Sequence, residues 1–223
     1  MLVDKPLRWT SFDVIGKLRK PLGAKIGHAG TLDPLATGLL ICCTGPFTKR
    51  IETFQKQPKE YIGTIHLGAT TPTFDLESEP EAFQPVNALS EEQIRAATAA
   101  FTGEIMQRPP IHSAIKKDGR RAYELARAGK DIKLAARPVT VTAFDITGIE
   151  GADIHFRVAC STGTYIRSLA NDFGAALGVG GYLSALRRTR IGEFRVADAK
   201  SVEEWMAHLK GVSTPDAARA LRP

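Results

Sequence analysis

Apolar and polar residues follow patterns along the chain that predict both strands and helices. The run from Gly38 to Thr44 is almost wholly apolar, which is typical of a buried strand. From Tyr61 onward residues alternate, so that Ile65 and Leu67 share a face with Tyr61 while the intervening residues point the other way. Strands are therefore expected at residues 38–44, 61–68 and 153–160.

Helices are predicted where a capping residue precedes apolar residues spaced three or four positions apart. Ser90 and Gln93 have the spacing of a capping box, and Gly178 is a stop signal after an amphipathic segment that starts at Thr164. Helices are expected from Thr10 or Ser11 to about residue 23, at 47–55, from 90 to about 101, at 164–177, and from Ser201 onward. This mixture predicts an α+β protein with a central mixed, mainly antiparallel sheet flanked by helices.

Composition places the chain among globular proteins, since 43% of its 223 residues are hydrophobic and 24% are charged. No apolar run approaches the roughly 18 residues of a membrane span, and the N-terminus carries no apolar signal segment. The chain has three cysteines, Cys42, Cys43 and Cys160, and they form no CxxC pair. We therefore expect them to be small core residues and the protein to reside in a reducing cytoplasm. Phosphate-loop motifs and zinc-like spacings are absent, so neither a cofactor nor a metal is expected.

Basic residues are concentrated in one segment, although the net charge of the chain is only +6. Residues 108–137 hold nine basic residues against three acidic ones, and turn residues at both ends predict a projecting hairpin. A second cluster comprises Arg187, Arg188, Arg190 and Arg195. Charge runs of this kind usually form solvated surface. We favour a nucleic-acid surface, because the imbalance lies in one protrusion beside His112 and Tyr123.

The segment HAGTLDPLATG holds a single acid, Asp33, in a glycine-rich loop. Pro34 restricts Asp33 to an extended backbone, and Leu32 and Leu35 can anchor the loop in apolar surroundings. The glycines, Gly38 among them, allow a ligand or another backbone to come close. This pattern indicates a carboxylate held in place with room in front of it; the alternative is an Asp that serves an ordinary turn.

Two other side chains are candidates for the same site. Arg167 lies in the first turn of a predicted helix, where the helix dipole disfavours a cation, so a partner such as Asp33 would explain its presence. Tyr61 begins a predicted strand and could stack on an unpaired base. The alternatives are an ordinary surface arginine and a tyrosine of the core.

Four segments together resemble the TruB family of RNA pseudouridine synthases: GHAGTLDPLATG, KEYIGTIHLGATTPTFD, RPPIHSAIKKDGRRAYELAR and CSTGTYIRSLANDFG. The resemblance runs from about Asp4 to Phe194. It implies the pseudouridine synthase fold and conversion of uridine to pseudouridine in the T-loop of tRNA, at the position numbered 55. It also implies that no cofactor, guide RNA or obligatory protein partner is needed. We further expect a monomer with no membrane association.

The resemblance also implies roles for individual residues. Asp33 matches the catalytic aspartate, Tyr61 the tyrosine that stacks on the target base, and Arg167 the arginine that pairs with the aspartate. His28 and Asp75 match a histidine and a second acid near the RNA. The RNA-clamping insertion is expected to bind substrate through Lys116, Lys117, Arg120 and Arg121.

Two features depart from the family pattern. The usual T-D-T-x-D run reads Thr71-Pro72-Thr73-Phe74-Asp75, so the proline alters the approach to Asp75. We expect a catalytic domain at 1–195, with the insertion at about 108–137, and a short helical extension at 196–223 in place of the PUA domain of many members. The main alternatives are a non-catalytic RNA-binding protein on the same scaffold and the catalytic subunit of a guide-RNA ribonucleoprotein.

Overall fold

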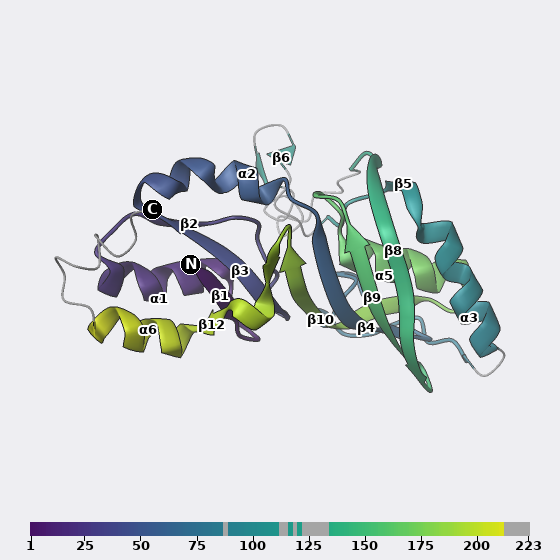
Figure 1. The fold of residues 1–223 in the computed structure, drawn as a ribbon. Coiled ribbons are helices and arrows are strands. Elements are labelled where there is room, and N and C mark those ends of the chain that lie inside the picture. Colours follow the sequence, from purple (N-terminus) through teal and green to yellow (C-terminus); the bar gives the residue numbers. More distant parts are fainter. Residues whose placement is uncertain (87–88, 112–115, 118–119, 122–133, 212–223) are drawn as a thin grey trace. The chain divides into compact units, whose positions relative to one another are not determined.

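The computed structural model describes residues 1–86, 89–111, 116–117, 120–121 and 134–211 (Figure 1). The chain divides into two compact units, each with its own network of contacts. Unit 1 comprises Met1–Tyr61 and Leu186–Pro223, and unit 2 comprises Ile62–Ala185. Strands β4 (Lys59–Leu67) and β10 (Gly181–Ile191) contribute residues to both.

Unit 1 is built on a sheet with the strand order β12-β1-β3-β10. Its elements are β1 (Leu2–Lys5), α1 (Ser11–Leu22), β2 (Ile26–His28), β3 (Ala36–Thr44), η1 (Gly45–Arg50), α2 (Ile51–Gln55), β11 (Phe194–Arg195), η3 (Val196–Asp198), β12 (Lys200–Ser201) and α6 (Val202–Gly211). Strand β1 runs antiparallel to β3, whereas β10 and β12 run parallel to their neighbours β3 and β1. The sheet is therefore mixed.

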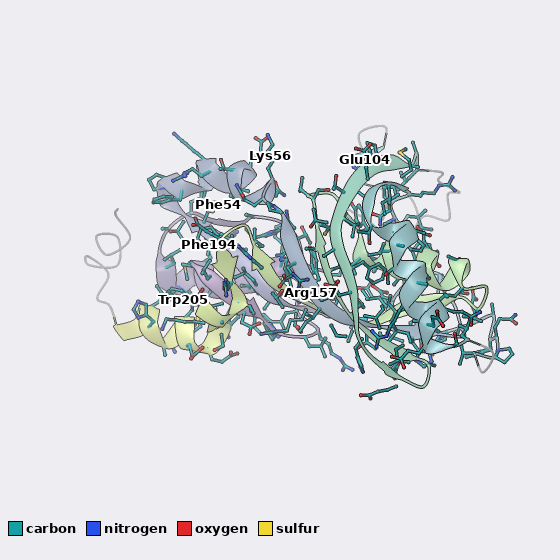
Figure 2. The ribbon with its side chains drawn as sticks, turned by 45° about the vertical axis from the view of Figure 1, so that its right-hand side comes forward. Phe54, Lys56, Glu104, Arg157, Phe194 and Trp205 are labelled. Carbon is teal, nitrogen blue, oxygen red and sulfur yellow. The ribbon has the colours of Figure 1, made fainter. Side chains whose placement is uncertain are left out.

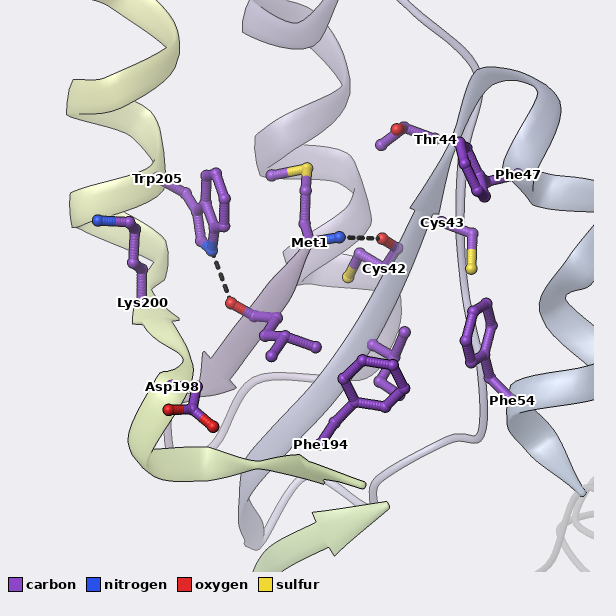
Figure 3. Close-up of a pocket in the computed structure, with 12 residues that line it drawn as sticks. Met1, Cys42, Cys43, Thr44, Phe47, Phe54, Phe194, Asp198, Lys200 and Trp205 are labelled. Carbon is purple, nitrogen blue, oxygen red and sulfur yellow. Dashed lines mark hydrogen bonds between the residues drawn. The ribbon is translucent and has the colours of Figure 1, made fainter. Parts of the chain in front are cut away.

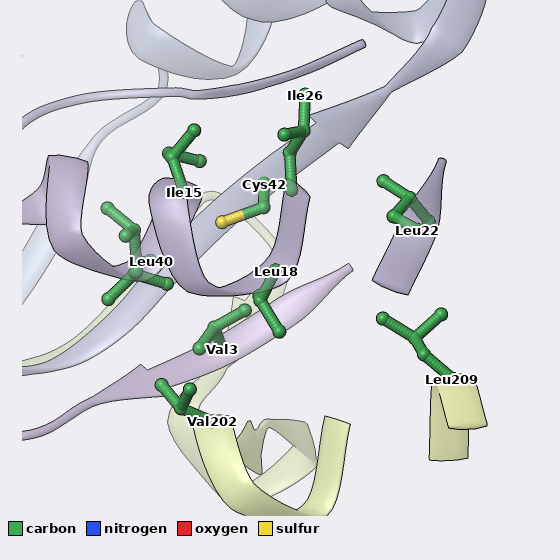
Figure 4. Close-up of a cluster of buried hydrophobic side chains, with 10 residues drawn as sticks. Val3, Ile15, Leu18, Leu22, Ile26, Leu40, Cys42, Val202 and Leu209 are labelled. Atoms are coloured by element: carbon green, nitrogen blue, oxygen red, sulfur yellow. The ribbon is translucent and has the colours of Figure 1, made fainter. Parts of the chain in front are cut away.

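Both faces of the unit 1 sheet are covered, which explains the apolar run in β3. Leu40 and Cys42 face helices α1 and α6 in one buried cluster (Figure 4). Leu39 and Ile41 belong to a second cluster, packed against Phe47, Ile51 and Phe54. Burial raises the pKa of the Cys42 thiol to about 12, so it stays protonated, as expected of a small core residue.

Capping residues define the two long helices of unit 1. Thr10 and Asp13 form the capping box of α1, and Gly23, at φ 62°, ends the helix in the left-handed conformation. Ser201 caps α6 by accepting from the backbone N–H of Glu204 at 3.1 Å. The sequence-based helices that start at residues 10–11 and 201 are confirmed.

A 450 Å³ apolar cavity between Trp205, Phe54 and Phe194 (Figure 3) is lined by none of the predicted site residues.

Unit 2 is built on strands in the order β10-β4-β9-β8-β5. Its further elements are α3 (Glu91–Ala97), η2 (Thr98–Phe101), β5 (Gly103–Gln107), β6 (Lys116–Lys117), β7 (Arg120–Arg121), β8 (Arg137–Glu150), β9 (Asp153–Cys160) and α5 (Ile166–Ala176). Strand β8 pairs antiparallel with β9 and with β5. Arg157, labelled in Figure 2, pairs with Asp145 across β9 and β8.

Helix α5 covers this sheet through its apolar stripe. Phe173 lies 5.2 Å from Phe144 and 5.9 Å from Phe101, measured between ring centroids. The predicted α+β class, with a mixed and mainly antiparallel sheet flanked by helices, is confirmed. No helix in the described part of the chain is both long enough and apolar enough to cross a membrane.

Candidate active site

The loop between β2 and β3 holds Asp33 through contacts to its neighbours. Ser11, at the start of α1, accepts from the backbone N–H of Leu32 at 2.9 Å and donates to the Leu32 carbonyl at 3.2 Å. Leu32 is buried, and the Ala36 N–H donates to the Asp33 carbonyl at 3.1 Å, which closes a turn around Pro34. The Asp33 side chain itself is half-buried. The backbone is therefore held on both sides of a half-buried aspartate.

Lys5 lies beneath this loop and is fully buried. Its ammonium group donates to the carbonyls of Pro6 at 3.0 Å, of Pro34 at 3.4 Å, and of Trp9. Burial lowers the pKa of Lys5 to about 8, the Asp33 carboxylate acts in the opposite direction, and Arg188 lowers the pKa further. Asp33 thus has a buried cation within electrostatic reach.

Arg188 on β10 is a second buried cation of unit 1, 1% exposed. Its Nε donates to Leu39 O at 2.8 Å, and its Nη2 donates to Gly30 O at 3.1 Å, so it ties the glycine-rich loop to the sheet. Gly38, at φ 100°, lies against the Arg188 backbone, where a Cβ would collide. This confirms the predicted close approach at Gly38. The prediction that Arg188 belongs to a nucleic-acid surface is wrong, because its side chain is buried.

His28 and Tyr61 are the other predicted site residues of unit 1. His28 ends β2, and its ring meets that of Phe12 edge to face at 5.3 Å. Burial, and secondly Arg188, lower the pKa of His28, so the imidazole is neutral near pH 7. Tyr61 on β4 is 7% exposed and, as predicted, shares the buried face with Ile65 and Leu67.

Asp75 and Arg167 come together within unit 2. The Arg167 Nε lies 3.5 Å from the Asp75 Oδ2, and each side chain is only 5% exposed. Arg167 also donates to Thr73 O at 3.2 Å, and Asp75 accepts from the Glu77 N–H at 3.0 Å. Arg167 is therefore no ordinary surface arginine. Its pairing with Asp33 concerns residues of different units and stays a prediction.

Gln107 on β5 fixes the start of the helix that carries Arg167. Its side chain accepts from the Tyr165 N–H at 2.8 Å and donates to the Tyr165 carbonyl at 3.0 Å. Tyr165 occupies the N-cap position of α5, which lacks a capping side chain of its own. The buried amide, 2% exposed, therefore holds the backbone two residues before Arg167.

The basic insertion is described only in part. The backbones of Lys116–Lys117 and Arg120–Arg121 pair as antiparallel strands β6 and β7, consistent with the predicted hairpin. His112, Tyr123 and the rest of residues 122–133 lie outside the described residues, as does the end of the predicted C-terminal extension, 212–223. The RNA-binding roles of the four basic residues stay predictions.

The predicted site residues did not include Lys5, Ser11 and Arg188. One signal was present for Lys5, because the alternation in LVDK places it on the buried face with Val3. The arrangement around Asp33, a positioned carboxylate with the buried Lys5 within electrostatic reach, suits nucleophilic attack or proton abstraction. Among the described residues, no group of three or more His, Cys, Asp or Glu side chains could hold a metal ion.

Comparisons with known proteins agree on one family. A model described as TruB family pseudouridylate synthase (N terminal domain) matches residues 19–166, and one described as tRNA pseudouridylate synthase B C-terminal domain matches residues 167–222. Curated proteins named tRNA pseudouridine synthase B are 53% identical in Flavobacterium johnsoniae and 51% identical in Phocaeicola vulgatus. These alignments cover 89% and 91% of this chain, and 90% and 91% of those proteins.

Solved structures show the same architecture. A chain from a Cbf5–Nop10–Gar1 complex superposes with a TM-score of 0.72 at 31% identity over 97% of this chain. A chain from an archaeal box H/ACA Nop10–Cbf5 complex superposes with a TM-score of 0.70 at 28% identity over all of it. This chain spans only 58% and 59% of those two solved chains.

Proposed function

The chain belongs to the TruB family of pseudouridylate synthases, and from this premise we propose that it converts uridine to pseudouridine in the T-loop of tRNA, at position 55. The observation that carries this proposal is the placement of Asp33. Its backbone is held between the Ser11 contacts to Leu32 and the turn at Pro34, with Lys5 buried behind it. A protein that only binds RNA has no need of such a carboxylate.

The reaction breaks the bond between N1 and C1′ and forms a bond between C5 and C1′; C5 loses its proton and N1 gains one, so no atoms are gained or lost overall. The target uridine must first leave its stack and enter the site. Asp33 then either attacks C1′ or removes a proton from C2′ while the glycosidic bond breaks. Both routes require an ionised carboxylate at bonding distance, and a nearby cation favours that form. Tyr61 is proposed to stack on the base and Arg167 to pair with Asp33.

Substrate binding is assigned to the basic insertion and to two further residues. Lys116, Lys117, Arg120 and Arg121 are proposed to contact phosphates, and His28 and Asp75 to lie near the RNA. We propose that the enzyme acts as a monomer in the cytoplasm, on the T-arm, without a cofactor, metal or obligatory protein partner.

One assay separates this proposal from its alternatives. The purified protein is incubated with an unmodified tRNA transcript, without guide RNA, and pseudouridine is detected at position 55. Formation at that position in excess chelator supports the proposal. Tight tRNA binding without product favours a non-catalytic RNA-binding protein. Product that appears only after a guide RNA and partner proteins are added favours the ribonucleoprotein subunit.

A further inference from the structure

The first turn of α1 presents an exposed aromatic ring beside the Asp33 loop. Phe12 is 63% exposed, and its ring meets His28 edge to face at 5.3 Å. The preceding residue, Ser11, holds the backbone of Leu32, next to Asp33. A single exposed apolar residue is ordinary on a protein surface, but this one lies next to a candidate active site.

The solvent face of α1 continues from Phe12 as a basic track. Gly16, Arg19 and Lys20 follow at positions i+4, i+7 and i+8, so they lie on the same face, and all are exposed. A Cβ at Gly16 would meet nothing within 4 Å, which leaves the surface open between the ring and the two cations. Seven residues of helix place Arg19 about 10 Å along the axis from Phe12.

The single acid of α1 does not oppose these cations. The Asp13 carboxylate accepts from the Thr10 N–H at 2.8 Å and the Thr10 hydroxyl at 2.7 Å, so it serves the helix N-terminus. Arg8 adds an exposed cation at the other end. Its backbone has φ 63°, unfavourable for arginine, and its N–H donates to Pro34 O at 2.8 Å, which fixes it next to the Asp33 loop.

We propose that this face of α1 binds substrate RNA, with an unpaired base stacked on Phe12 and phosphates of the same strand contacting Arg8, Arg19 and Lys20. An aromatic platform in line with cations is the arrangement by which proteins hold single-stranded nucleic acid. With one apolar side chain, the face is too polar for the core of a protein interface. The inference rests on the proposed function and adds a second contact surface to it.

The test compares RNA binding by Phe12→Ala and Phe12→Trp, with Phe83→Ala as the control. Phe83 is 74% exposed and belongs to unit 2, so its removal has the same effect on surface apolarity. Loss of a stacked base weakens binding about 5- to 150-fold, so Phe12→Ala should raise the Kd for a T-arm RNA at least fivefold. Phe12→Trp should bind like the original protein, and RNA should quench the introduced indole.

Charge reversal at Arg19 and Lys20 should lower the salt slope of log Kd by about 0.7 for each lost phosphate contact. The proposal fails if Phe12→Ala binds RNA no more weakly than Phe83→Ala, or if Phe12→Trp is as weak as Phe12→Ala. These readouts measure binding alone. Absence of pseudouridine in the original protein would therefore overturn the proposed function and leave the stacking test intact.

Discussion

The Ser11 hydroxyl bonds both backbone polar groups of Leu32, at 2.9 Å to the N–H and 3.2 Å to the carbonyl. The two residues are 21 positions apart, and both are buried. This contact joins the first turn of α1 to the loop that carries Asp33. A single side chain thus sets the distance between a helix of the unit 1 core and the proposed catalyst.

Removing this hydroxyl should affect both stability and turnover. Ser11→Ala leaves a buried donor and a buried acceptor without a partner, which costs about 1–3 kcal/mol for each unsatisfied group. We expect a lower free energy of unfolding in urea, together with a lower kcat, because the loop loses its anchor. Ser90→Ala is the control, since it removes the exposed N-cap of α3 at a cost of about 1 kcal/mol. Equal loss of kcat in both variants would show that Ser11 acts only through stability.

Lys5 should make stability depend on pH in an unusual direction. Its pKa is about 8 in the folded protein and 10.5 in the unfolded chain, so the unfolded state binds more protons between these values. The contribution of Lys5 to the free energy of unfolding therefore rises with pH across that window, by about 3 kcal/mol. Urea unfolding of the original protein and of Lys5→Met, from pH 7 to 11, measures the difference, in which other groups cancel. A difference that stays constant with pH would contradict a lowered pKa for the buried Lys5.

Breaking the buried Asp75–Arg167 pair should destabilise the protein more than breaking a shorter pair on the surface. Asp75→Asn leaves the Arg167 charge buried and should destabilise the protein by about 3–5 kcal/mol. Asp145→Asn removes an exposed partner of Arg157 at 2.7 Å and should cost less than about 1 kcal/mol. Denaturant unfolding of both variants decides whether burial or distance controls the cost. Similar losses would mean that Asp75 does not hold the arginine.

Local patterns predicted those elements whose boundaries depend on neighbouring residues. The strand at 153–160 coincides with β9, and the helix at 90–101 is α3 continued by η2. Strand β10 was not predicted, because it contains Arg187, Arg188 and Arg190 of the predicted basic cluster and its buried residues do not alternate regularly. Strand β8, the longest of unit 2, was not predicted at all.

Only those site residues that lie in a local sequence motif could be predicted. Asp33 stands out in its own loop, since glycine, proline and leucine surround it within a few residues. Lys5 has only the alternation with Val3 to indicate its burial, and its contact with Pro34 O spans 29 residues. Arg188 has no local signal, because its Nε donates to a carbonyl 149 residues away. The contact of Arg167 with Asp75 also joins residues far apart in the sequence, and it was not predicted.

The basic hairpin should dominate tRNA affinity. Reversing Lys116, Lys117, Arg120 and Arg121 to Glu should weaken binding strongly and flatten its salt dependence, by about 0.7–0.9 in the log–log slope for each lost contact. A matched control reverses four exposed lysines of unit 1, namely Lys25, Lys56, Lys200 and Lys210. An equal change of slope in the control would indicate a general charge effect instead of a binding hairpin.

The central claim is that Asp33 is the catalyst, and pseudouridine formation by Asp33→Asn tests it most directly. Asn retains the size of the side chain and is tolerated in turns, so the protein should fold and bind tRNA within roughly tenfold of the original affinity, about 1.4 kcal/mol. Pseudouridine at position 55 of a tRNA transcript should fall to background. Appreciable pseudouridine formation by the folded Asp33→Asn variant would contradict the assignment of Asp33 as the catalyst.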